Sequence, residues 1–295
     1  MRWIPVFYTS RQVANTSSTS PSAGKPAKVV ARWQDLGLPI RIFEPTPVTP
    51  ADFTLVHERS FVEDVLALRR NNGFSNRSVS VPSSLPYTTG AMVTAARYVL
   101  ENGGVACAPC SGFHHAGFDR PCGYCTFNGL VVTAMKLKKE GRVKRVGILD
   151  CDQHLGDGTE DLIRYHNLSP WLRHVTAGLH YERHAPTLLS RLPALMKLFE
   201  KCDVLLYQAG ADPHVDDPLG GFMTDDQLAE RDAIVFAKAK AMKLPIVWNL
   251  AGGYQEPLSK VLDIHDRTMK ACVDAYCERE RGAVRRGSRI EPRAA

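Results

Sequence analysis

Long apolar runs are missing from this 295-residue chain. No segment approaches the roughly eighteen consecutive apolar residues of a transmembrane helix, so we do not expect a membrane protein. Residues 1–5 lack the apolar core of a secretory signal peptide. These absences predict a protein that works in the cytoplasm without membrane contacts.

A disulfide pattern is missing as well. Eight cysteines stand at irregular spacings in a long chain, which favours reduced thiols over the disulfide framework of short secreted proteins. Cys107-x-x-Cys110 and Cys122-x-x-Cys125 superficially resemble a four-thiolate zinc knuckle. The eleven residues between the pairs are fewer than such sites usually have, and Cys107 falls in an expected strand. The knuckle is therefore the weaker interpretation.

Neither a linker nor an internal repeat divides the chain, and its hydrophobic content of 44% is ordinary for a globular protein. The net charge of +6 comes from 37 basic and 31 acidic residues, with several basic residues near the carboxyl terminus. We predict one domain over 1–279 and a flexible basic tail at 280–295. Nucleic-acid binding by this charge is not expected; salt-sensitive binding without zinc-dependent hydrolysis would support it.

Hydrophobic periodicity predicts an α/β fold in which strands and helices alternate. Strands are expected at 3–8, 40–43, 104–108, 145–150, 173–179, 203–208 and 245–250. Helices are expected at 29–36, within 50–70, from 87 to 102, and near 126–140, 159–166, 187–200, 225–242 and 256–279. The segments 9–27 and 71–86 are expected to be loops. Such alternation predicts one open parallel sheet with helices on both faces.

The segment 150–159 concentrates three carboxylates and an imidazole directly after an apolar strand. Because alternate residues of a strand face the same way, Asp150, Asp152 and His154 should project together from its carboxyl end. Open α/β sheets keep their ligand sites at that end. Carboxylate oxygen and imidazole nitrogen suit a catalytic zinc, which takes three protein ligands and leaves one position to water.

Three other predicted strands also end in chemically useful residues. The strands at 104–108, 203–208 and 245–250 precede, in that order, the pair His114 and His115, Asp212, and Tyr254. Asp212 completes a set of three ligands with Asp152 and His154. A water at the open position of such a metal has a lowered pKa.

The remaining residues fit the proton transfers that this water requires. His114 and His115 can take its proton and deliver one to a leaving group. Asp150 and Asp157 are the carboxylates left to fix the histidine tautomers. Tyr254, on a glycine turn, can stabilise a tetrahedral oxyanion. The implied reaction is metal-assisted hydrolysis of an amide.

With these residues identified, the chain resembles the histone deacetylase and acetylpolyamine amidohydrolase family of the arginase–deacetylase superfamily, especially its short bacterial-type or class IV-like members. The resemblance spans roughly 3–276. It rests on the segment 150–159 and on four further motifs, which are Gly112-Phe113-His114-His115-Ala116, Gly123-Tyr124-Cys125-Thr126-Phe127-Asn128, Gly210-Ala211-Asp212 and Gly252-Gly253-Tyr254.

The resemblance implies a role for each site residue. It makes Asp152, His154 and Asp212 the ligands of zinc, or of iron(II) in its place. It pairs His114 with Asp150 and His115 with Asp157, and it uses Tyr254 to polarise the acyl carbonyl. The walls of a narrow channel for the acylated side chain are then Gly123, Tyr124, Gly252 and Gly253.

The function that the resemblance implies is a zinc-dependent deacylase acting on an acylated lysine side chain or a small acylated amine. An acetylpolyamine amidohydrolase is the alternative, but a polycation would favour an acidic channel mouth. The candidate rim residues are mixed in charge: Arg59, Arg77, Arg120, Arg183, His184, Asp119, Glu182, Asp216 and Asp217.

Two other classes of protein are weaker alternatives. A catalytically weak acyl-lysine binding module would be marked by loss of a metal ligand or of Tyr254, and neither is missing. A binuclear, arginase-like hydrolase needs a carboxylate two residues beyond His154, where Gly156 stands.

Four departures from the family pattern concern the surroundings of the site. Leu155 stands where many members have a second histidine, and Gly178-Leu179 stands where a serine side chain binds a structural potassium ion. No aspartate occurs between Asp64 and Asp119 to serve as the acidic rim residue. The segment 21–26 replaces a His-Pro-Glu motif. We therefore expect intact chemistry and a divergent rim, with potassium binding and the oligomeric state left open.

Overall fold

Seven strands form one parallel sheet in the computed structural model, which describes residues 1–177 and 183–277. The strands are β1 (Ile4–Phe7), β2 (Ile40–Phe43), β3 (Val105–Cys107), β4 (Val146–Asp150), β5 (Leu172–Thr176), β6 (Val204–Gln208) and β7 (Ile246–Asn249). Their order is β2-β1-β3-β7-β6-β4-β5, and every pair of neighbours is parallel. The expected open parallel sheet is confirmed.

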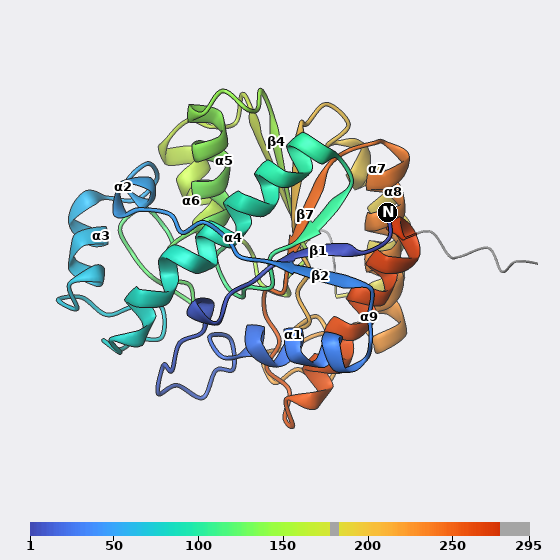
Figure 1. Cartoon of the computed structure of the whole chain (residues 1–295), viewed down its shortest axis with the longest axis horizontal. Helices are drawn as coiled ribbons and strands as arrows, with labels where there is room; N and C mark the ends of the chain where they lie inside the picture. The colour runs from blue at the N-terminus through green and yellow to red at the C-terminus, as the bar shows by residue number, and fades with distance from the viewer. Residues whose placement is uncertain (178–182, 278–295) are drawn as a thin grey trace, which may run out of the picture.

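Helices cover both faces of this sheet (Figure 1). They are η1 (Ser10–Gln12), α1 (Lys25–Asp35), α2 (Pro50–Phe53), α3 (Arg59–Leu66), α4 (Ser80–Asn102), α5 (Gly129–Lys139), α6 (Asp157–Tyr165), α7 (Ala185–Lys197), α8 (Asp225–Ala241) and α9 (Ser259–Tyr276). Buried residues of α1, α7, α8 and α9 pack on one face, and those of α3, α4, α5 and α6 pack on the other. The central strands are therefore apolar on both sides.

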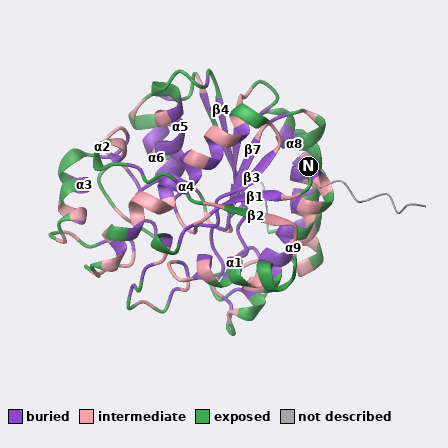
Figure 2. Ribbon diagram, viewed as in Figure 1, coloured by how far each residue is buried: buried purple, intermediate pink, exposed green. Residues whose placement is uncertain are grey.

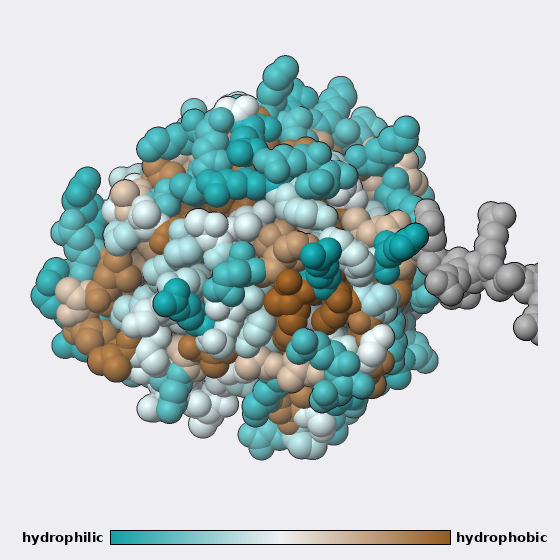
Figure 3. Space-filling view, viewed as in Figure 1, coloured by the Kyte–Doolittle hydropathy of each residue, from teal (hydrophilic) through white to brown (hydrophobic). Residues whose placement is uncertain are grey.

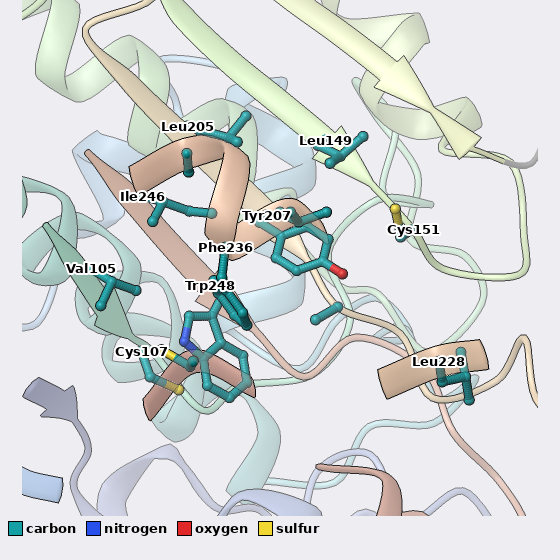
Figure 4. Packing of buried hydrophobic residues seen from close by; sticks show 14 of the residues in the cluster. Val105, Cys107, Leu149, Cys151, Leu205, Tyr207, Leu228, Phe236, Ile246 and Trp248 are labelled. Atoms are coloured by element: carbon teal, nitrogen blue, oxygen red, sulfur yellow. The ribbon is translucent and has the colours of Figure 1, made fainter. Parts of the chain in front are cut away.

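The alternation of strand side chains explains how one sheet supports two hydrophobic cores. Leu205 and Tyr207 of β6 point to the core with α8 and α9, whereas Leu206 points to the other core. Figure 4 shows part of the first core, where Phe236 and Trp248 lie close together. Their ring centroids are 5.9 Å apart. This packing fixes the strands whose carboxyl ends carry the site.

Two helices begin earlier than the sequence predicts. α4 starts at Ser80 and not at Tyr87, in a segment that its prolines and serines suggest is a loop. Its early turns form because Val81 and Ser84 are buried, and Pro82 lies in the first turn, where a missing N–H costs nothing. α1 likewise begins at Lys25, inside the predicted loop at 9–27. Tertiary burial overrides local composition in both cases.

The surface is polar, and the sheet is mostly buried except along its edge strand β2, whose residues are exposed or half-buried. Figure 2 shows buried residues along the central strands and exposed residues on the outer sides of the helices. Figure 3 shows only small hydrophobic patches between hydrophilic ones on the visible face. None of the helices within the described residues is both long enough and apolar enough to cross a bilayer. The predicted tail at 280–295 lies outside the described residues.

A glycine in β4 gives a test of the core packing. A methyl group at Gly147 would lie 2.5 Å from Phe199 Cδ1 and 3.1 Å from Leu205 Cδ1. We expect Gly147→Ala to lower the free energy of unfolding by about 1–3 kcal/mol, because a close-packed core resists added volume. Urea unfolding of both proteins measures the change.

Gly24→Ala is the matched control for this substitution. Its methyl group would have Pro21 O at 3.9 Å as its nearest neighbour, so the stability should stay near that of the wild type. Equal or higher stability of Gly147→Ala would contradict the packing described here, because it would mean that Phe199 yields without cost.

Candidate active site

The predicted site residues meet at the carboxyl ends of four adjacent strands. β3, β7, β6 and β4 are neighbours in the sheet, and the residues that follow them turn toward one point. Asp150 is the last residue of β4, and Asp152 and His154 follow it in a bend. A parallel sheet brings together residues from distant parts of the chain in this way.

Asp152, His154 and Asp212 form a group that can hold one metal ion. One ligand atom from each residue lies within 4.8 Å of the others. The Nδ1 atom of His154 is 3.1 Å from Asp152 Oδ1 and 3.0 Å from Asp212 Oδ2. Both aspartates are buried, so their charges are poorly screened by solvent. Two carboxylates and one imidazole suit a divalent cation such as zinc.

The electrostatics of this group also favour a cation. Burial and the adjacent Asp152 raise the pKa of Asp212 to about 8. Hydrogen bonds with Asp152 and Asp212 raise the pKa of His154 to about 10. The two carboxylates are therefore costly to ionise together unless a positive charge lies between them. A divalent ion would supply more positive charge than the His154 imidazolium.

Main-chain amides hold the two carboxylates in place. Gly252 N donates to Asp152 Oδ2 at 2.8 Å, and Gln153 N donates to Asp212 Oδ1 at 3.2 Å. A side chain at Gly252 would lie 2.4 Å from Asp212 Oδ2. Position 252 must therefore be glycine for the main chain to approach both carboxylates.

Two histidine–aspartate pairs lie beside the metal group. His114 Nδ1 is 2.7 Å from Asp150 Oδ2, and His115 Nδ1 is 2.6 Å from Asp157 Oδ1. The two imidazole centroids are 4.0 Å apart. Each carboxylate can accept the Nδ1–H of its histidine, which fixes the tautomer and leaves Nε2 for chemistry.

The two histidines differ in basicity because their surroundings differ. Burial alone would lower the pKa of His114, but the charges of Asp150 and Asp152 outweigh it and raise the pKa to about 9. Burial and the neighbouring His114 lower the pKa of His115. At neutral pH, His114 therefore favours the charged form and His115 the neutral form.

Tyr254 lies beside Tyr124, one of the predicted channel residues. The ring centroids of Tyr254 and Tyr124 are 5.5 Å apart. Burial, with Asp152 and Asp212, raises the pKa of Tyr254, so its phenol stays protonated and can donate a hydrogen bond. Gly123 has φ +51° and a side chain there would lie 2.4 Å from His115 Cδ2, so the turn before Tyr124 requires glycine.

The sequence did not indicate two buried cations that support the site. Lys25 Nζ donates to the carbonyls of Ala251 and Gly252 at 2.7 and 3.1 Å. Arg231 donates through one guanidinium nitrogen to the carbonyls of Cys151 and Gly210 at 3.1 and 2.8 Å. Arg231 links the two loops that carry the candidate ligands, whereas Lys25 holds the loop after β7, and only their burial could have identified them.

Some predicted surroundings differ in the structure or lie outside it. Asp217, a candidate rim residue, is only 5% exposed because its carboxylate binds main-chain amides. Glu182 and the Gly178-Leu179 position of the potassium site lie outside the described residues. The four cysteines considered as a knuckle are free thiols, and within the described residues they do not gather as metal ligands.

Comparison with known proteins identifies related chains. The sequence model of the histone deacetylase domain matches residues 22–170. An uncharacterised protein from Picosynechococcus sp. is 27% identical over 267 residues, which cover 81% of this chain and 87% of that protein.

Solved structures match over nearly the whole chain. The HDA15 HD domain superposes with a TM-score of 0.75 at 16% identity, covering 94% of this chain and 91% of that one. The acetylpolyamine aminohydrolase from Burkholderia pseudomallei gives a TM-score of 0.71 at 17% identity and covers 92% and 99%. At these identities the structures indicate a shared fold.

A buried histidine beneath the site predicts a pH dependence of stability. His57 Nε2 accepts from Asn128 N at 2.9 Å, so Nδ1 donates to Gly117 O at 2.8 Å and the ring is neutral. Burial lowers its pKa to about 4. Because the unfolded chain takes up the proton first, His57 stabilises the fold fully above pH ~6.5 and progressively less down to pH ~4.

As the pH falls from ~6.5 to ~4, we expect the contribution of His57 to the free energy of unfolding to fall by about 1.4 kcal/mol per pH unit. Urea unfolding at several pH values measures this change. The free energy of unfolding of His57→Gln, whose side chain cannot titrate, should depend less steeply on pH. Identical slopes would exclude His57 as a source of the dependence.

Proposed function

This chain belongs to the histone deacetylase family, and on that basis we propose that it hydrolyses the amide of an acylated lysine side chain or small acylated amine with the help of zinc. The observation that carries this proposal is the convergence of a metal-ligand group with two histidine–aspartate pairs. His114 Nε2 is 3.6 Å from Asp152 Oδ1, and the rings of His115 and His154 are 5.8 Å apart. Proton carriers and candidate ligands thus share one small volume.

Asp152, His154 and Asp212 would hold the zinc ion, and iron(II) fits the same donors. Such an ion lowers the pKa of a bound water, which makes water a nucleophile at neutral pH. The residues around the ion then have separate tasks in binding, orientation and proton transfer.

His115 is the residue suited to carry the proton. Its Nδ1 atom is engaged by Asp157, and its lowered pKa leaves Nε2 free to accept a proton from the attacking water. The same proton can pass from Nε2 to the amine nitrogen as the carbon–nitrogen bond breaks, so protons balance without another acid. His114, charged and held by Asp150, supplies positive potential beside the reaction.

Tyr254 would bind the acyl oxygen. Its protonated phenol can donate to the carbonyl as negative charge develops on the oxygen, which lowers the barrier. A binding module without catalysis would need neither this donor nor the proton carriers.

The substrate class follows from the side chains near the site. Leu155, next to the candidate ligand His154, is 38% exposed, and Leu219, tied through Asp217 to the Tyr254 main chain, is 46% exposed. Apolar side chains here favour the aliphatic part of an acyl-lysine over a polycation such as an acetylated polyamine.

The metal assignment is tested with Asp212→Ala. Removing this carboxylate opens the coordination shell, so we expect the purified variant to hold far less zinc than the wild type and to lose its activity. Metal analysis after reconstitution gives the first result. Assays on acetyl-lysine peptides, acetylpolyamines and longer acyl-lysines give the second and identify the preferred substrate.

Asp35→Asn is a suitable control, because it removes an exposed carboxylate at the carboxyl end of α1, which has no assigned role in the site. It should keep both zinc and activity. Full metal occupancy and full activity in Asp212→Ala would refute the assignment.

The two histidines provide a separate prediction. We expect His115→Ala to lower kcat by about 10²–10⁴-fold, because the group that carries the proton is lost. His114→Ala should lower kcat less, since it removes only charge and support. Steady-state kinetics of both zinc-loaded variants decide the order, and wild-type turnover in His115→Ala would contradict the proposed proton carrier.

A further inference from the structure

Asp217 is a buried carboxylate that binds the main chain at two positions, Tyr254 and Leu219. Its Oδ2 atom accepts from Tyr254 N at 2.8 Å, and its Oδ1 atom accepts from Leu219 N at 3.0 Å. The residue is 5% exposed, so these bonds are poorly screened by water. Hydrogen bonds to an ionised carboxylate are also stronger than those between neutral groups.

The segment that carries Tyr254 needs such support. It runs from Leu250 to Leu258, between β7 and α9, without helix or strand. Gly253 has φ +139°, a conformation that side-chain-bearing residues rarely adopt. The Ser22 side chain hydrogen-bonds the phenol of Tyr254, so the position of the phenol depends on this contact and on what holds the main chain next to it.

Other bonds hold the start of the same segment. Lys25 Nζ binds the carbonyls of Ala251 and Gly252, and Asp152 Oδ2 binds the amide of Gly252. All three bonds lie before Gly253, whereas the Asp217 bond lies after it, at the amide of Tyr254. The Asp217 carboxylate is thus placed to determine the orientation of the Tyr254 side chain.

We propose that Asp217 is a positioning residue that fixes the Tyr254 phenol for catalysis, because its carboxylate ties the main chain of Tyr254 to that of Leu219. This inference rests on the proposed amide hydrolysis, in which Tyr254 contacts the acyl oxygen. Asp217 acts through the two amides and does not touch the substrate.

The effect on catalysis is tested with Asp217→Ala in the zinc-loaded enzyme. Losing a charge-assisted hydrogen bond that orders the phenol should lower kcat by about 10- to 100-fold, with little change in KM and in zinc content. Asp217→Asn should lie in between, because its one amide oxygen can serve only one of the two N–H groups. Asp35→Asn, which removes an exposed carboxylate at the carboxyl end of α1, should match the wild type.

A double-mutant cycle separates positioning from a general structural role. In a Tyr254→Phe background the phenolic hydroxyl is already absent, so Asp217→Ala should lower kcat by less than about threefold further. An equal loss in both backgrounds would overturn the proposal, because it would mean that Asp217 acts on the whole fold and not through Tyr254.

Amide hydrogen exchange gives a result that does not depend on activity. Peptides that contain Tyr254 should exchange at least about tenfold faster in Asp217→Ala than in the wild type, by a smaller factor in Asp217→Asn, and at the wild-type rate in Asp35→Asn. Unchanged exchange in Asp217→Ala would overturn the proposal. If the wild type hydrolyses no acylated amine, the proposed function fails, and the exchange result still decides whether Asp217 fixes Tyr254.

Discussion

The burial of two carboxylates side by side is the constraint on which the rest of this site depends. Asp152 and Asp212 lie at the ends of adjacent strands, almost without exposure to solvent, and taking such charges out of water costs several kcal/mol each. The surroundings offset this cost with the amides of Gln153 and Gly252 and with the ammonium group of Lys25. A bound divalent cation would further offset the cost of burying these two charges.

The need to offset these buried charges explains why distant segments of the chain meet at the site. Lys25 lies near the amino terminus, yet its charge acts on Asp212 and its ammonium group donates to two carbonyls of the loop after β7. Arg231 enters from α8 and joins the carbonyls of Cys151 and Gly210, one in each ligand-bearing loop. The two hydrophobic cores hold the strands in position. The side chains of Lys25 and Arg231 hold the loops at the strand ends in position.

The sequence predicted the parts of the site that depend on local pattern. The spacing of Asp150, Asp152 and His154 predicted that they would lie close together, although β4 ends at Asp150 and the other two residues follow in a bend and not in a strand. It could not identify Lys25 or Arg231, or the burial of Asp217, because these depend on which segments meet in three dimensions. The start of α4 was missed for the same reason, since buried contacts outweighed its proline content.

His114 and His115 have identical side chains, but their different surroundings give the two imidazoles different pKa values. His114 is enclosed between Asp150 and Asp152, and negative charge on both sides outweighs the cost of burying its proton. His115 forms a close pair with one aspartate, Asp157. The centroid of the charged His114 ring lies 4.0 Å from the centroid of the His115 ring. Protonating His115 would place two positive rings together, so a proton taken up there is held weakly and is easily released. A weakly held proton is what a carrier between water and a leaving amine requires, and the more solvent-accessible histidine of the pair is the one that has it.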